Sequence, residues 1–171
     1  MLAAEGLVVI APNRGATVAA LTIAEVEDAL ELVIGLESLA AARACERASE
    51  AAIAEIEGLH RQMLEAFRGQ HLMDYFEINQ AIHQKIVDAA GNGELSRVYA
   101  QECARIKRYR YAGNRRHERW ECAIAEHDAL LAALKERDGA LLRELLRAHH
   151  RSGWRVARPL VESELAGDSA V

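Results

Sequence analysis

The chain has 171 residues, enough for one domain with a small addition, and hydrophobic residues at 51% of positions supply a core. Its net charge of −5 excludes a strongly basic nucleic-acid-binding protein for the chain as a whole. No apolar run approaches the roughly 20 residues of a membrane span, and three irregularly spaced cysteines give no disulfide framework, so we expect a cytoplasmic protein with no membrane partner.

The first 20 residues differ in pattern from the rest. A β-branched run at residues 7–10 is followed by turn-forming residues and then by a second strand-like run from Ala16. This pattern predicts a β-hairpin with a loop of about five residues. We therefore divide the chain into a short segment over residues 1–20, a helical domain over 21–163 and a small, polar, flexible tail over 164–171.

Helical periodicity and helix-end signals predict six helices after the hairpin. Thr22 and Glu25 form a capping box that starts the first helix, and Ser49 is a suitable N-cap for the second. Because the connections are short, we expect an all-α fold in which consecutive helices pack antiparallel in a bundle. The expected helices cover residues 22–45, 49–69, 74–91, 92–111, 116–137 and 139–161.

Three of the predicted helices carry one histidine each in an otherwise apolar stripe. These are His83, with Asn79 one turn before it, His127 and His149, whereas His150 lies about 100° further round and is expected at the edge. Imidazoles buried together without partners are costly, and a metal ion that accepts a lone pair from each removes that cost. Asn79, His83, His127 and His149 are therefore candidate ligands for Zn, Ni, Mn or Fe as a divalent ion.

The histidine pattern leaves three classes of protein open. Open coordination positions suit either the binding of a small ligand or a small hydrolase with a His₃ metal site and a bound water. For a hydrolase, Glu126 is the nearest general base in sequence, but it points about 100° away from His127 and is expected to face outward. The third class is a structural bundle whose histidines bind water and backbone. We find no H-E-x-x-H, G-x-S-x-G or P-loop motif.

Basic residues concentrate between positions 105 and 119. Such a cluster is typical of a solvated helix face, but it is also suited to bidentate binding of an anion inside the bundle. Contact with nucleic acid is a third reading, which the acidic remainder of the chain disfavours. For anion binding, we select Arg105 and Arg108 as candidate effector contacts.

Five pieces of the helical part form a specific set: FEINQAIH at 76–83, AAGN at 89–92 with Leu95, EHDALLAAL at 126–134, RD at 137–138 and RAH at 147–149. With these pieces, the chain over approximately residues 22–156 resembles the FCD effector domain of the FadR subgroup of GntR transcription regulators. The resemblance implies a metal held by Asn79, His83, His127 and His149, and a small organic acid that completes the coordination. It also implies a ligand-sensing regulator rather than an enzyme, and a homodimer formed through the helical domain.

Residues 2–8 and 12–18 resemble the end of the GntR winged-helix domain, in which the tip of a hairpin wing enters the DNA minor groove. Arg14 and Gly15 match the wing tip. The resemblance implies base-reading helices before Met1, so specific operator binding is expected only of a longer form. Three origins of the shorter chain stay open: a natural truncation, a mis-assigned start and a fragment. One departure is that the family's arginine in the first effector helix has no counterpart at residues 32–37.

Overall fold

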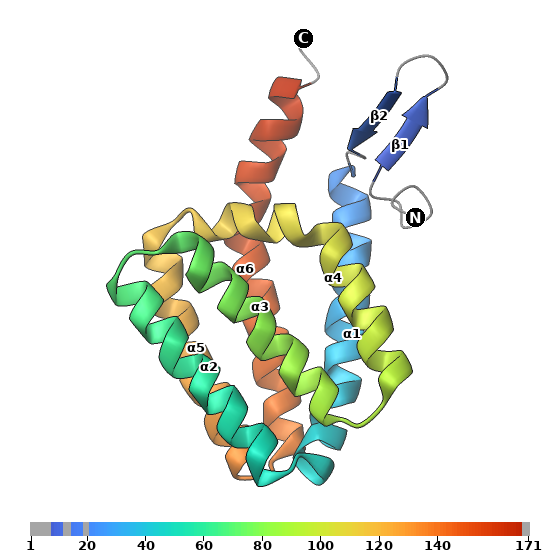
Figure 1. Ribbon diagram of the computed structural model, residues 1–171. Helices are drawn as coiled ribbons and strands as arrows, with labels where there is room; N and C mark the ends of the chain where they lie inside the picture. The colour runs from blue at the N-terminus through green and yellow to red at the C-terminus, as the bar shows by residue number, and fades with distance from the viewer. Residues whose placement is uncertain (1–7, 12–14, 19–20, 169–171) are drawn as a thin grey trace.

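The computed structural model describes residues 8–11, 15–18 and 21–168, which form two strands and six helices (Figure 1). Strands β1 (Val8–Ala11) and β2 (Gly15–Val18) pair antiparallel, with Val8 opposite Val18. The predicted wing residue Arg14 lies outside the described residues, and Gly15 begins β2. The prediction of a six-helix fold is confirmed. The helices are α1 (Ile23–Arg47), α2 (Glu50–Arg68), α3 (Leu72–Ala89), α4 (Gly93–Asn114), α5 (His117–Lys135) and α6 (Gly139–Asp168).

The helix starts follow the capping signals in the sequence. The Thr22 hydroxyl accepts a hydrogen bond from the Glu25 backbone amide at 3.3 Å, and the Glu25 carboxylate accepts one from the Thr22 amide at 2.8 Å. The Ser49 and Asn92 side chains cap α2 and α4 in the same way. Because each cap satisfies an amide that the helix leaves unpaired, it stabilises the folded chain by about 1 kcal/mol.

The last helix extends further than predicted. We expected it to end near residue 161, with a tail from 164, but α6 continues to Asp168, so the predicted tail is wrong for residues 164–168. Val161 is buried, and Leu165 packs partly buried against the same core cluster. Glu164 also forms an ion pair with Arg115 at the end of α4. These contacts keep the end of the helix ordered despite its small and polar residues.

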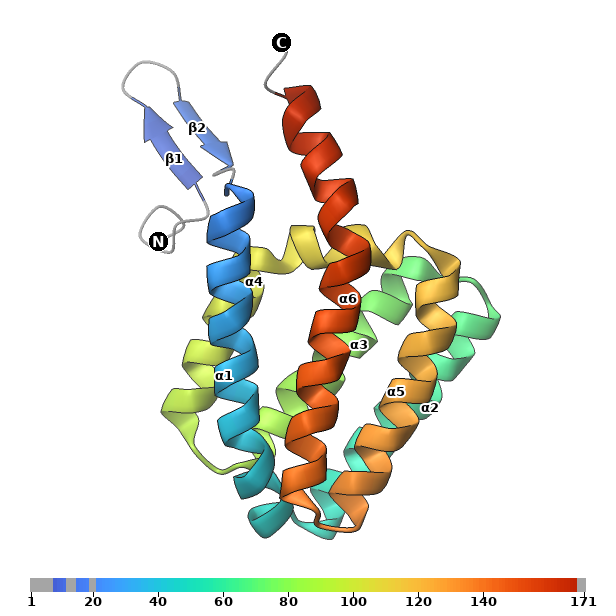
Figure 2. The ribbon, with the colours of Figure 1, turned by 180° about the vertical axis from the view of Figure 1, so that it is seen from behind.

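The longest helices, α1 and α6, run antiparallel and side by side through the molecule, α3 packs between α1 and α2, and α4 and α5 both contact α6 (Figures 1 and 2). The first of two apolar clusters joins the end of α1, α2, α3, α5 and the first half of α6, with Met63, Leu130 and Leu142 in it. The second joins the start and middle of α1, the end of α3, α4 and the second half of α6, with Val33 and Ile106. The middles of α1, α3 and α6 therefore lie where the two clusters meet.

The start of α1 is tied to α4 and α6. The Leu21 backbone amide donates to the Tyr109 hydroxyl at 2.6 Å. Glu27 accepts hydrogen bonds from the Trp154 indole at 3.1 Å and from Arg158 at 2.9 Å.

Within the described residues, no helix is both long and apolar enough to cross a membrane.

Candidate metal centre and ligand cavity

Six polar side chains from four helices lie buried between the two apolar clusters. Each is at most 5% exposed. They occupy core-facing positions of α1, α3, α5 and α6, where an apolar residue would otherwise pack, so their polar atoms need partners inside the protein. The six are Glu37, Asn79, His83, His127, His149 and His150.

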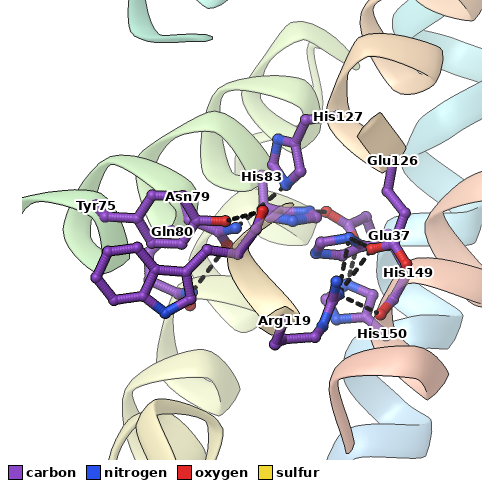
Figure 3. Close-up of polar contacts among 11 residues, drawn as sticks. Glu37, Tyr75, Asn79, Gln80, His83, Arg119, Glu126, His127, His149 and His150 are labelled. Carbon is purple, nitrogen blue, oxygen red and sulfur yellow. Dashed lines mark hydrogen bonds and ion pairs between the residues drawn. The ribbon is translucent and has the colours of Figure 1, made fainter. Parts of the chain in front are cut away.

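The structure brings the four predicted metal-ligating residues together (Figure 3). One ring nitrogen each of His83, His127 and His149 lies within 4.8 Å of the others, and the three ring centroids are 4.8–5.0 Å apart. The Asn79 amide nitrogen is 3.2 Å from Nε2 of His127. We call His83, His127 and His149 the open cluster. That it binds a metal stays a prediction.

The open cluster contains ring nitrogens without hydrogen-bond partners. Nδ1 of His83 donates to the Glu37 carboxylate at 2.7 Å, so Nε2 carries the lone pair, and this buried atom has no partner. Nδ1 of His127 is likewise buried and unpaired. An unsatisfied buried polar atom costs about 1–3 kcal/mol. A cation that accepts the lone pair on Nε2 of His83 would remove that cost, so the donor set fits a metal ion.

Two histidines of the open cluster, His127 and His149, are also in the protonation state that metal binding needs. Burial and the neighbouring His149 and His83 hold the pKa of His127 well below its usual value. Burial and the neighbouring His83 and His150 do the same to the pKa of His149. Both rings are therefore neutral near pH 7, with a lone pair available to a cation.

Glu37 is a site residue that the sequence analysis missed. It is 0% exposed and accepts hydrogen bonds from Nδ1 of His83 and Nε2 of His150. Although burial alone would raise the pKa of Glu37, the two imidazoles hold it well below the usual value. The available signal was a charged residue in the apolar stripe of α1, four positions after the buried Val33. We call Glu37, His83 and His150 the paired cluster.

The prediction that His150 lies at the edge is wrong. Its ring is 4% exposed, and burial lowers its pKa to about 4 even though Glu37 opposes the shift. The physical reason is that α6 packs against α1, α4 and α5 at once. Two flanks of α6 are therefore covered, and two consecutive histidines are both buried.

Glu126 also faces the site, contrary to the prediction that it points outward. Its Oε2 accepts hydrogen bonds from Nδ1 of His149 at 2.7 Å and from Nη2 of Arg119 at 2.7 Å. The carboxylate keeps 29% of its side-chain surface exposed, so it closes the site at its rim. Because Nδ1 of His149 donates to Glu126, Nε2 of that ring is left with the lone pair.

A cavity of about 40 Å³ adjoins these residues, and Arg110, Arg119 and Trp154 contribute to its wall. The predicted effector contacts Arg105 and Arg108 do not line it. Arg105 pairs with Glu102 at 3.6 Å, and Arg108 donates to the Tyr109 hydroxyl at 2.5 Å. Arg110 lies about 200° round the helix from Arg108, which explains why it reaches the cavity and Arg108 does not. The other polar residues of the cavity wall are Asn79, Gln80, Asn114, His149 and His150.

The chain is similar to known regulators. Residues 28–152 match the family model described as the FCD domain. The HTH-type transcriptional repressor RspR of Escherichia coli K12 is 28% identical over 149 residues, which are 86% of this chain and 65% of that relative. A protein of Shigella flexneri named as an uncharacterized HTH-type transcriptional regulator, YdfH, matches to the same extent. The chain thus spans slightly less than two thirds of the length of these relatives.

Two solved structures show the same fold. E. coli McbR/YncC superposes with a TM-score of 0.81 at 20% identity, covering 93% of this chain and 80% of that one. A GntR-family transcriptional regulator from Pseudomonas syringae pv. tomato has a TM-score of 0.64 at 21% identity, covering 98% of this chain and 69% of that one. The likeness therefore covers the helical arrangement that positions the buried polar residues.

Proposed function

Because the chain belongs to the FCD-domain family of GntR-type transcription regulators, we propose that it senses a small organic acid through a bound metal ion and so controls DNA binding. The observation that carries this proposal is the unpaired Nε2 of His83, buried beside two neutral histidines. A structural bundle would leave that atom unsatisfied at a cost of about 1–3 kcal/mol.

The ion would be held by one ring nitrogen each of His83, His127 and His149 and by the Asn79 amide. That amide would have to turn so that its oxygen faces His127 in place of its nitrogen. These ligands suit Zn²⁺, Ni²⁺, Mn²⁺ or Fe²⁺. When bound, the ion supplies a positive charge and open coordination positions that attract a carboxylate. Glu37 and Glu126 orient the rings of His83 and His149, as outer carboxylates do in metal sites.

The wider regulatory role extends the same proposal. A carboxylate effector that prefers one packing of the helices shifts the population of the domain toward it. We propose that the helical domain forms a homodimer, that the chain belongs to the FadR subgroup and works in the cytoplasm, and that operator DNA is bound by a form carrying a helix-turn-helix. The similarity to RspR, named as a transcriptional repressor, supports this role.

A hydrolase with the same histidines is not favoured. The relatives are named as transcription regulators. Glu126, the general-base candidate selected from the sequence, already accepts hydrogen bonds from Arg119 and His149. A carboxylate engaged by two strong donors is poorly placed to take a proton from water.

The test is metal analysis of the purified chain after chelation and reconstitution with each of the four ions in turn. We expect one equivalent to bind wild type, and His127→Ala to lose it. His71→Ala is the matched control because its side chain is 67% exposed and lies outside the open cluster. Loaded protein should then bind a C2–C4 carboxylate saturably without hydrolysing test esters. Absence of stoichiometric metal under all conditions would refute the proposal.

A further inference from the structure

We infer that Arg119 binds the carboxylate of the effector, with Glu126 as the residue that positions it. This inference rests on the proposed function, since it takes the ligand to be a small carboxylate. It replaces Arg105 and Arg108, which lie away from the cavity, and it gives the site a cationic contact although residues 32–37 of α1 contain no arginine.

Arg119 is a buried cation with an unused donor. It lies in the first turn of α5, is 7% exposed and lines the cavity beside His149. Its Nη1 is buried and has no hydrogen-bond partner. Burying a guanidinium is costly unless its donors are satisfied, and this group stays charged at any physiological pH. The unpaired Nη1 is therefore a hydrogen-bond donor that an anionic oxygen would satisfy.

The other end of the guanidinium is already fixed. Nη2 donates to Oε2 of Glu126 at 2.7 Å and lies 3.4 Å from the backbone oxygen of His149. The same Oε2 accepts from Nδ1 of His149 at 2.7 Å. One carboxylate thus holds both the proposed metal ligand His149 and Arg119 (Figure 3). An ion bound by His149 and the guanidinium of Arg119 would therefore be in a fixed relation to each other.

The cavity selects for a small anion. None of its described lining residues is acidic, whereas Arg110 and Arg119 are both cationic. Its volume of about 40 Å³ corresponds to roughly three water molecules at 10–15 Å³ each. This space matches a small carboxylate such as acetate, which has four non-hydrogen atoms, placed between His149 and Arg119 in the cavity wall.

The experiment uses the intact chain loaded with Zn²⁺ and calorimetric titration with acetate, lactate, malonate and succinate, with acetamide as the neutral isostere of acetate. We expect Arg119→Met to keep its zinc and to weaken binding of the best carboxylate at least about tenfold, the size of a lost charge-assisted contact. Arg119→Lys should fall between, because it keeps the charge and loses the planar fork. Arg105→Met, the matched control, should bind as wild type does.

The outcomes separate this inference from the proposed function. Zinc-loaded Arg119→Met that binds the carboxylate as tightly as wild type overturns the role of Arg119 and leaves metal-dependent sensing intact. If wild type takes up no metal, the proposed function fails. Titration of metal-free wild type and metal-free Arg119→Met with the carboxylates then still tests the role of Arg119. If no carboxylate of the panel binds wild type in either state, both fail.

In case Arg119→Met does not fold, a second variant combines it with Glu126→Gln. This double variant removes both charges of the pair. This double variant should unfold cooperatively and retain zinc while binding carboxylate at least about tenfold more weakly than Glu126→Gln alone. Equal carboxylate affinity in the double variant and in Glu126→Gln would overturn the inference.

Discussion

His83 belongs to two buried polar clusters that treat its two ring nitrogens differently. In the paired cluster, Glu37 accepts hydrogen bonds from both His83 and His150, so the facing polar atoms satisfy one another. In the open cluster, Nε2 of His83 and Nδ1 of His127 have no partner. Both clusters offer three potential ligand atoms. Hydrogen-bond satisfaction therefore distinguishes the paired cluster from the open cluster, which we propose to bind the metal ion. Residue types alone do not make this distinction.

The strongest way to break this comparison is to remove the shared ring. His83→Ala should lower zinc affinity by more than about 100-fold, beyond the range seen for outer-shell partners. It also removes a partner of the buried Glu37, which should cost about 3–5 kcal/mol of unfolding free energy. Competition with a chromophoric chelator and urea unfolding measure the two effects. Zinc affinity within tenfold of wild type would mean that His83 is not a ligand.

The neighbouring histidines of α6 give a matched pair. His149→Ala should lower zinc affinity by about 100-fold because it removes a ligand, whereas His150→Ala should change it by tenfold or less. The cost of His150→Ala should appear instead in urea unfolding, since Glu37 loses a partner. Similar zinc affinities for the two variants would contradict the assignment of His149 to the open cluster and His150 to the paired cluster.

Glu37→Gln sharpens the comparison without changing the shape of the side chain. The amide keeps one acceptor oxygen but cannot satisfy both imidazoles as a carboxylate does, so the ring of His83 is held less firmly. We expect about a tenfold loss of zinc affinity, at the lower end of outer-shell effects. Glu46→Gln, on the exposed part of α1, is the control. Unchanged zinc affinity would make the paired cluster a structural feature only.

The smallest effect is expected for Glu126→Gln. Its carboxylate orients His149 but is 29% exposed, so water can replace part of the lost contact. Zinc affinity should fall only a few-fold, less than the roughly tenfold minimum typical of outer-shell residues. The chelator competition assay again measures it. A loss larger than that of Glu37→Gln would reverse the proposed ranking of the two carboxylates.

Local signals in the sequence predicted much of this structure, because capping residues and helical periodicity act within one helix. Thr22 and Ser49 marked helix starts correctly, and periodicity placed His83, His127 and His149 on buried faces. What it could not predict depends on neighbouring helices. Whether Arg108 or Arg119 reaches the cavity depends on how α4 and α5 pack on α6. The hydrophobic periodicity of a single helix carries no information about that packing.

The hydrogen bond between Tyr109 and Leu21 couples the cavity wall to the start of α1. Arg110 forms part of the cavity wall, and the preceding residue, Tyr109, holds the backbone amide of Leu21 through its hydroxyl. Leu21 is the last residue before the N-cap of α1, on the side of the chain that leads back to the strands. A ligand that displaces this turn of α4 must therefore either move the start of α1 with it or break a buried hydrogen bond. A change in the cavity wall is in this way coupled to the position of Leu21.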